Sequence, residues 1–277
     1  VEFLEQPFQA IVQLGIGQFL QFENGADVFL DVQFAEDRGF LRQVGQAEPG
    51  PGVHRGMGQA VIVDVHLATI GGVKQVLLFD ANGLAGHDLK SGVELWRFSW
   101  ENQQKINVAQ PLVLDEQHVF IGCWYGKAGM LVNVTQADGK WTAKKAWTND
   151  DKVMQLKFTS AVMRKEGDVE YLYGLDDGKL QCVSARDGKE KWKDTRDAKK
   201  GRGYGHGQVL LCDDLLVITT EFNELVLVEA TSADFRELGR ITALNKGPKN
   251  WNNAAIVNGK IYLRNEQEMV CYDLAAK

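Results

Sequence analysis

The stretch YGLDDGKLQCVSARDGKEKW, residues 173–192, decides the fold class. A short apolar run enters an Asp-Gly pair, a second short strand follows, and a second Asp-Gly pair precedes a lone tryptophan. Asp-Gly pairs tolerate the positive φ angles that tight β-hairpins require. The stretch therefore predicts a β-hairpin of short antiparallel strands, and the rest of the chain shows whether it recurs.

The hairpin recurs along the chain. Residues 83–96, GLAGHDLKSGVELW, align without a gap with residues 179–192, and weaker copies stand at 128–141 and 224–235. A repeat period in the forties that is built from short strands is typical of propeller blades. A fifth copy begins near residue 268. The equivalent points, with spacings of 45, 51, 45 and 44 residues, are Asp88, Asn133, Ser184, Glu229 and Asp273.

The repeated unit resembles that of PQQ-like (quinoprotein-type) β-propellers. Its pattern is strand, Asp-Gly turn, strand and then Ala-x-[Asp/Thr]-Gly-x-x-x-Trp, and the resemblance covers residues 60–277. In that family the tryptophan and the preceding glycine pack between neighbouring blades. Trp147 fits this position more loosely than Trp96 and Trp192 do. The resemblance thus implies a structural docking role for Trp96, Trp192, Gly92 and Gly188.

The expected fold is an all-β propeller with four-stranded antiparallel blades. Members of the family usually close a ring of seven or eight blades, whereas this sequence holds four full units and a partial fifth. We therefore expect four to five blades in an open or incomplete ring. Unpaired strand edges on an open ring would favour self-association.

The N-terminal residues differ in composition from the rest. Residues 1–73 lack Lys, Ser, Trp, Tyr and Cys, and they carry nine acidic residues against three arginines, which is the whole net charge of −6. We therefore divide the chain into an atypical segment, 1–59, and a propeller domain, 60–277. The segment is interpreted as a separate acidic module, as an irregular lead-in, or as a stretch outside the native reading frame. The Gly/Pro-rich residues 48–59 mark the boundary.

Several classes of function find no signal in the sequence. The chain shows no signal peptide and starts without Met, so we expect a fragment or a processed chain. No apolar run is long enough for a transmembrane segment, and the balanced charge after residue 73 speaks against nucleic acid. No catalytic or metal-binding motif occurs. Buried free thiols, or one disulfide among them, are expected for Cys123, Cys182, Cys212 and Cys271.

A polar cluster precedes the innermost strand of each expected blade. Equivalent points on successive blades face the propeller axis, so these side chains should converge at one mouth of the central channel. They either cap strand ends and hold channel water, or they form a site for a polar, sugar-like or quinone-like ligand with a tryptophan as the stacking face. The candidate ligand-binding residues are Asn107, Gln110, Lys157, Ser160, His206, Gln208, Trp251, Asn252 and Asn253.

Three functions remain open from the sequence. The first is a non-catalytic scaffold that binds a protein partner, a polar small molecule or a polysaccharide and needs no cofactor. The resemblance implies a periplasmic or secreted location for it, in the cell envelope. The second is a quinoprotein-type oxidoreductase using PQQ and Ca²⁺, although the adjacent cysteine pair of the alcohol-oxidising members has no counterpart here. The third is a fragment without activity of its own.

Overall fold

The computed structural model describes residues 64–148, 153–196, 203–245, 247 and 249–274. All of them belong to one unit of the chain, Val61–Lys277. The interpretations of residues 1–59 fall outside the described residues. Among the residues described, no helix is long and apolar enough to cross a membrane.

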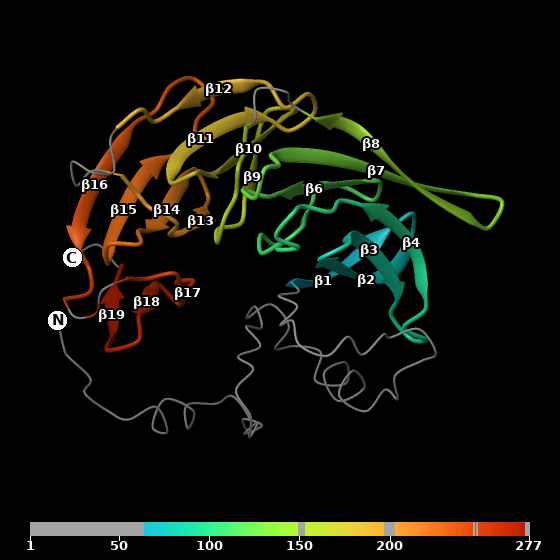
Figure 1. Ribbon diagram of the computed structural model, residues 1–277. Coiled ribbons are helices and arrows are strands. Elements are labelled where there is room, and N and C mark those ends of the chain that lie inside the picture. Colours follow the sequence, from blue (N-terminus) through green and yellow to red (C-terminus); the bar gives the residue numbers. More distant parts are fainter. Residues whose placement is uncertain (1–63, 149–152, 197–202, 246, 248, 275–277) are drawn as a thin grey trace. The chain divides into compact units, whose positions relative to one another are not determined.

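The described residues form five antiparallel sheets in which each strand pairs with the next one along the chain. We number these sheets as blades 1 to 5 in chain order (Figure 1). The prediction of an open, all-β propeller with four to five blades is confirmed. Blade 1 comprises β1 (Asp64–Ile70), β2 (Val73–Asp80), β3 (Gly83–Asp88) and β4 (Glu94–Ser99); blade 2, β5 (Leu112–Val113), β6 (His118–Gly122), β7 (Gly129–Ala137) and β8 (Lys140–Thr148); blade 3, β9 (Val162–Glu166), β10 (Val169–Asp176), β11 (Lys179–Ser184) and β12 (Glu190–Lys193); blade 4, β13 (Gln208–Cys212), β14 (Leu215–Thr219), β15 (Glu224–Glu229) and β16 (Glu237–Thr242); blade 5, β17 (Ala255–Val257), β18 (Lys260–Arg264) and β19 (Met269–Asp273).

The opening stretch forms the second, third and fourth strands of blade 3. Asp177 and Gly178 take φ angles of 47° and 81° in the turn between β10 and β11, because a two-residue hairpin turn needs positive φ at both positions. Tyr173 then pairs with Cys182 across the hairpin. The Asp-Gly pair therefore sets the register of the blade.

A β-bulge recurs between the third and fourth strands of blades 1 to 4. The bulge places one residue of each fourth strand opposite the same point of the third strand. These residues are Trp96 opposite Gly86, Trp147 opposite Leu131, Trp192 opposite Cys182 and Gly239 opposite Leu227. The repeat is therefore present in the strand register as well as in the sequence. Among these four blades, only blade 4 has another residue, Gly239, in place of the tryptophan.

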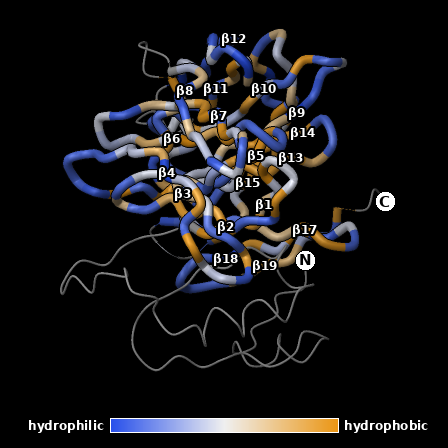
Figure 2. Tube along the Cα trace, turned by 90° about the vertical axis from the view of Figure 1, so that its right-hand side faces the viewer, coloured by the Kyte–Doolittle hydropathy of each residue, from blue (hydrophilic) through white to orange (hydrophobic). Residues whose placement is uncertain are grey.

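The hydrophobic core lies between neighbouring blades. Phe79 of blade 1 belongs to one buried cluster with Val132 of blade 2, and Tyr173 of blade 3 shares another with Ile218 of blade 4. Further clusters join blades 2 and 3 and blades 4 and 5. Hydrophobic residues follow the strands, and hydrophilic residues fill many of the connecting loops (Figure 2). Each blade therefore depends on its neighbours for burial, as repeat architectures do.

All four cysteines are free thiols. Cys123 and Cys182 are buried, and Cys212 and Cys271 are partly buried. Burial raises the pKa of Cys182 to about 12, which keeps this thiol protonated and unreactive. The expectation of free thiols is met, and two of them retain some exposure to solvent.

Candidate functional site

Two tryptophans link each of their blades to the next. Trp192 donates its indole N–H to the carbonyl oxygen of Thr231 in blade 4, at 2.7 Å. Trp147 donates to the carbonyl oxygen of Ala185 in blade 3, at 3.0 Å, and lies directly over Gly188. A Cβ atom on Gly188 would stand 2.6 Å from the Trp147 ring, so only glycine fits there. Trp147 makes this contact although its sequence matched the repeat less well.

The first and fourth blades depart from this arrangement. Trp96 donates its indole N–H to Gln75 within its own blade, at 2.7 Å, and packs over Gly86. Gly92 lies in an exposed turn, with open space where a Cβ atom would stand. Gly239 takes the tryptophan position of blade 4 and is likewise surrounded by open space. Among the described residues, the indole hydrogen bond to the next blade therefore occurs at the junctions between blades 2 and 3 and between blades 3 and 4, whereas Trp96 contributes apolar packing to the buried cluster of blades 1 and 2.

Several residues of the predicted polar ring join neighbouring blades. The backbone N–H of Gln110 donates to the hydroxyl of Ser160, at 2.9 Å, and the Gln110 amide lies 3.0 Å from Nδ1 of His66. The amide of Gln208 donates to the carbonyl oxygens of Phe158 and Trp251, at 2.6 and 2.9 Å. These side chains therefore bridge blades, as buried polar groups must find partners.

Three asparagines of the predicted ring have separate surroundings. Asn107 is buried and donates to the carbonyl oxygen of Asp80, at 2.7 Å. Asn252 is half-buried, and its backbone N–H donates to the side-chain oxygen of Asn250, whereas Asn253 is exposed. Asn107 is thus occupied by a structural contact, and Asn253 is open to solvent.

The remaining ring residues meet aromatic side chains that the sequence reading did not single out. The Phe158 ring lies 5.0 Å from that of Trp251 and 5.6 Å from that of His206, measured between centroids. The ammonium of Lys157 lies 4.5 Å from the centre of the Trp124 ring and 5.3 Å from that of Phe158. Cations over aromatic faces are attracted by the ring quadrupole. Loops of blades 2 to 5 thus contribute to one group of side chains.

Glu221 anchors the other side of this group. Its carboxylate accepts a hydrogen bond from the backbone N–H of His206, at 3.0 Å, and pairs with the ammonium of Lys249, at 2.8 Å. Lys249 in turn lies 5.5 Å from the ring of Trp251. We call this group the aromatic loop surface; it consists of Trp124, Lys157, Phe158, His206, Glu221, Lys249, Asn250 and Trp251.

Two nitrogen atoms in the aromatic loop surface lack partners among the described residues. They are Nδ1 of His206 and the amide nitrogen of Asn250, and both are enclosed. Asn250 is 1% exposed, and its backbone N–H donates to the carbonyl oxygen of Glu221. Burial and the charge of Lys157 lower the pKa of His206, so the ring is neutral at pH 7. An unpaired buried donor is costly, which marks this surface as a place where a ligand group fits.

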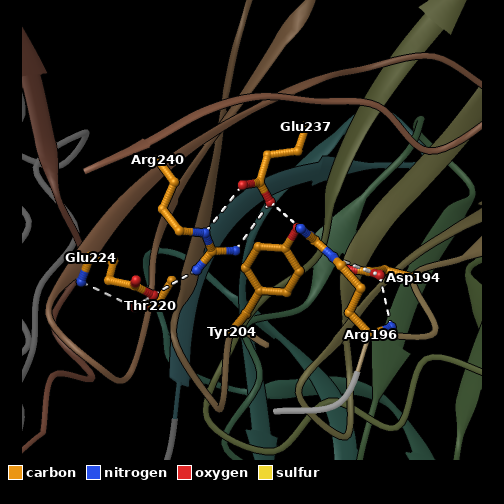
Figure 3. Close-up of polar contacts among 7 residues, drawn as sticks. All are labelled: Asp194, Arg196, Tyr204, Thr220, Glu224, Glu237 and Arg240. Carbon is orange, nitrogen blue, oxygen red and sulfur yellow. Dashed lines mark hydrogen bonds and ion pairs between the residues drawn. The ribbon is translucent and has the colours of Figure 1, made fainter. Parts of the chain in front are cut away.

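A second polar cluster, shown in Figure 3, holds blades 3 and 4 together. Arg196 forms ion pairs with Asp194 and Glu237, at 2.7 and 2.6 Å, and donates to the hydroxyl of Tyr204, at 2.6 Å. Glu237 also pairs with Arg240, at 3.1 Å. The fully buried Tyr204 ring lies between both guanidinium groups, at 5.6 and 5.3 Å.

Every described charge in this cluster has a partner, which indicates a structural role. Burial would raise the pKa of Glu237, but the hydrogen bonds from Arg240 and Arg196 hold it below its usual value. No periodic pattern marks this cluster in the sequence, because Arg196, Tyr204 and Glu237 come from three separate segments. A shallow cavity of about 360 Å³ lies elsewhere, lined by Glu101–Gln104 and 125–127.

The resemblance to quinoproteins would imply a Ca²⁺ site that holds PQQ. Among the described residues, no three His, Cys, Asp or Glu side chains gather as metal ligands. Ca²⁺ needs six to eight oxygen ligands, usually including several carboxylates. Glu221 is the only carboxylate in the aromatic loop surface as defined here, and Lys249 already pairs with it. The residues described do not fit such a group.

Comparison with known families identifies the chain. The family model described as outer membrane protein assembly factor BamB matches residues 80–277. The chain belongs to this family. The match confirms the resemblance to PQQ-like propeller repeats and spans the second strand of blade 1 to the end of the chain. The comparison with curated proteins gave no match.

Solved structures share the fold at low sequence identity. Sqt1 of Saccharomyces cerevisiae is 13% identical with a TM-score of 0.52, covering 79% of this chain and 61% of Sqt1. Dihydro-heme d1 dehydrogenase NirN in complex with DHE is 13% identical with a TM-score of 0.50, covering 79% of this chain and 46% of NirN. A protein of unknown function from Bacteroides caccae is 14% identical with a TM-score of 0.47, covering 76% of this chain and 78% of that one. The chain thus spans about half of NirN and three-fifths of Sqt1, and their likeness extends to the fold alone.

Proposed function

We propose that this protein is a non-catalytic binding scaffold of the cell envelope that serves outer membrane protein assembly. The family match carries the proposal, because the family is described by that process. A scaffold needs a rigid frame and an exposed face for its partner. The bridging contacts of Gln110 and Gln208 and the docked Trp147 and Trp192 supply the rigid frame.

The aromatic loop surface is the face on which the proposed partner binds. Trp251 is 47% exposed, and Phe222, which follows Glu221 in the chain, is 45% exposed. Aromatic residues are enriched at the energetic centres of protein interfaces. The lysines beside them supply charge at the rim. A partner that buries Trp251 would therefore gain both apolar area and polar contacts.

The proposal is tested in the source organism by deleting the gene and measuring the levels of outer membrane proteins. Deletion should lower those levels, and the wild-type gene should restore them. A Trp251→Ala gene should restore them poorly at equal protein abundance. A Val93→Ala gene is the matched control, because Val93 is 60% exposed and lies in the turn between β3 and β4, away from the aromatic loop surface. Unchanged levels after deletion would overturn the proposed function.

A further inference from the structure

The aromatic loop surface offers hydrogen-bond donors and positive charge more than acceptors. The enclosed amide nitrogen of Asn250 is a donor, and Nδ1 of the neutral His206 ring donates in one of its two tautomers. Lys157 and Lys249 both lie close enough to lower the pKa of His206. A ligand group that accepts hydrogen bonds and carries negative charge matches this set of atoms.

The charges in this surface do not cancel. Glu221 is engaged by Lys249 at 2.8 Å. Lys157 has no ion pair within 4 Å among the described residues, and its ammonium lies over the rings of Trp124 and Phe158 instead. Aromatic faces attract a cation without neutralising it. Among the described residues, Lys157 is therefore a cation without an ion pair, close to His206, a ring that the carboxylates of Glu221 and Asp177 also influence.

The exposed Trp251 ring adds an apolar contact to the charged one. Its neighbour Phe158 is half-buried, and Gln208 fixes both residues through their carbonyl oxygens. A ligand that pairs a carboxylate with a flat or apolar side chain would satisfy both parts of the surface. An acidic residue next to an aromatic residue in a peptide has this combination.

We infer that the aromatic loop surface binds a carboxylate side chain in an acidic, aromatic-containing peptide segment of the protein partner. This inference rests on the proposed function, and it adds the chemistry of the partner. The carboxylate accepts hydrogen bonds from the Asn250 amide and His206 and pairs with Lys157. Because the two unpaired nitrogens are enclosed, the ligand must displace a covering side chain. Lys249 and Trp251, which flank Asn250 in the chain, are 58% and 47% exposed.

The test is a titration of the full chain with two peptides that differ only in charge. The acidic peptide is acetyl-Gly-Glu-Phe-Glu-Gly-amide, and its neutral match replaces both glutamates with glutamine. Calorimetry gives the dissociation constants. The acidic peptide should bind at least about tenfold more tightly, a ratio worth about 1.4 kcal/mol.

Three variants assign the binding to this surface. Lys157→Gln and Asn250→Asp should each weaken binding of the acidic peptide by about tenfold, because the first removes the cation and the second replaces the donor with a carboxylate of the same shape that repels the ligand. Lys189→Gln is the matched control, since Lys189 is 80% exposed in a turn of the opposite blade ends, and it should leave the affinity unchanged. Circular dichroism checks that each variant folds, and Lys157→Gln, at a half-buried position, still tests the inference if Asn250→Asp does not fold.

Other outcomes would overturn the inference. Equal binding of both peptides would show an apolar contact without carboxylate recognition. Tighter binding of trigalacturonate than of the acidic peptide would show an acidic-sugar site. Binding of neither peptide would also overturn the inference, yet a fall in outer membrane protein levels on deletion of the gene would leave the proposed function standing. Normal levels after deletion would remove the function itself.

Discussion

Replacing Trp192 with alanine should destabilise the fold at the junction of blades 3 and 4. The side chain is 7% exposed and belongs to the cluster that joins these blades. Its ring lies 6.0 Å from that of Tyr173 and 5.7 Å from that of Phe235, between centroids. Its indole N–H donates to the carbonyl oxygen of Thr231 at 2.7 Å.

The expected loss follows from these contacts. A buried tryptophan removes about 150–250 Å² from water, which corresponds to about 4–6 kcal/mol at 25 cal/mol per Å². Alanine keeps part of this contact, and the extended unfolded chain makes the area an upper bound, so Trp192→Ala should lower the free energy of unfolding by about 3–5 kcal/mol even with the added cost of a cavity. Trp192→Phe keeps most of the apolar contact and gives up the hydrogen bond to Thr231, which should cost about 1–2 kcal/mol.

Urea unfolding of the full chain, followed by far-ultraviolet circular dichroism, measures both values. The slope of the transition must be compared between variants, because it reports the surface exposed on unfolding. Trp251→Ala is the control: the same residue type in an exposed position should cost under about 0.5 kcal/mol. A loss under about 1 kcal/mol for Trp192→Ala would refute the docking role of this tryptophan.

Three further predictions concern a glycine, a histidine and a cofactor. Gly188→Ala should lower the free energy of unfolding by about 1–3 kcal/mol more than Gly92→Ala does. Both glycines have a φ of 69°, but only Gly188 lies against Trp147. Equal unfolding midpoints for the two variants would contradict this prediction. His206 has a lowered pKa in the fold, so the unfolded chain takes up its proton first as the pH falls. The free energy of unfolding should therefore decrease below about pH 6.5, and it should decrease less in His206→Gln. Parallel pH profiles of the two proteins would refute this prediction. Calorimetric titration with PQQ, with and without Ca²⁺, should give no saturable heat, and saturable binding would support the oxidoreductase alternative.

The repeat was readable from the sequence because strand length, turn residues and spacing all point the same way. Asp177-Gly178 could be placed in a hairpin turn, since few residue pairs accept two positive φ angles. The spacing of the repeat then gave the blades and the position of Trp192. Agreement among these local signals is what allows a fold to be predicted from one sequence.

Contacts between blades were harder to predict. Trp147 fits the repeat loosely, yet it reaches Ala185 and Gly188, because the bulge in β7 and β8 places it as in blade 3. Trp96 fits the repeat well, yet it donates to Gln75, a residue outside the aligned unit. The partner of each tryptophan lies outside the aligned unit, in the next blade for Trp147 and in an earlier strand of the same blade for Trp96, so the motif alone does not identify it.

The candidate site was predictable only in part for the same reason. The spacing of the polar clusters marked Lys157, His206, Gln208 and Trp251, which come together with Phe158 across blades 3 to 5. It did not mark Glu221, which lies in the loop between β14 and β15. Nor did it separate side chains that bridge blades from those that remain open to a ligand.

Site-specific photo-crosslinking in the envelope of the source organism tests the proposed scaffold role most directly. A photoreactive phenylalanine derivative would replace Trp251 in one variant and the more exposed Val93 in another, and mass spectrometry would identify the crosslinked products. The proposed function predicts that position 251 crosslinks to a component of outer membrane protein assembly and that position 93 does not. Products of the same identity and yield from both positions, or none from position 251, would contradict it.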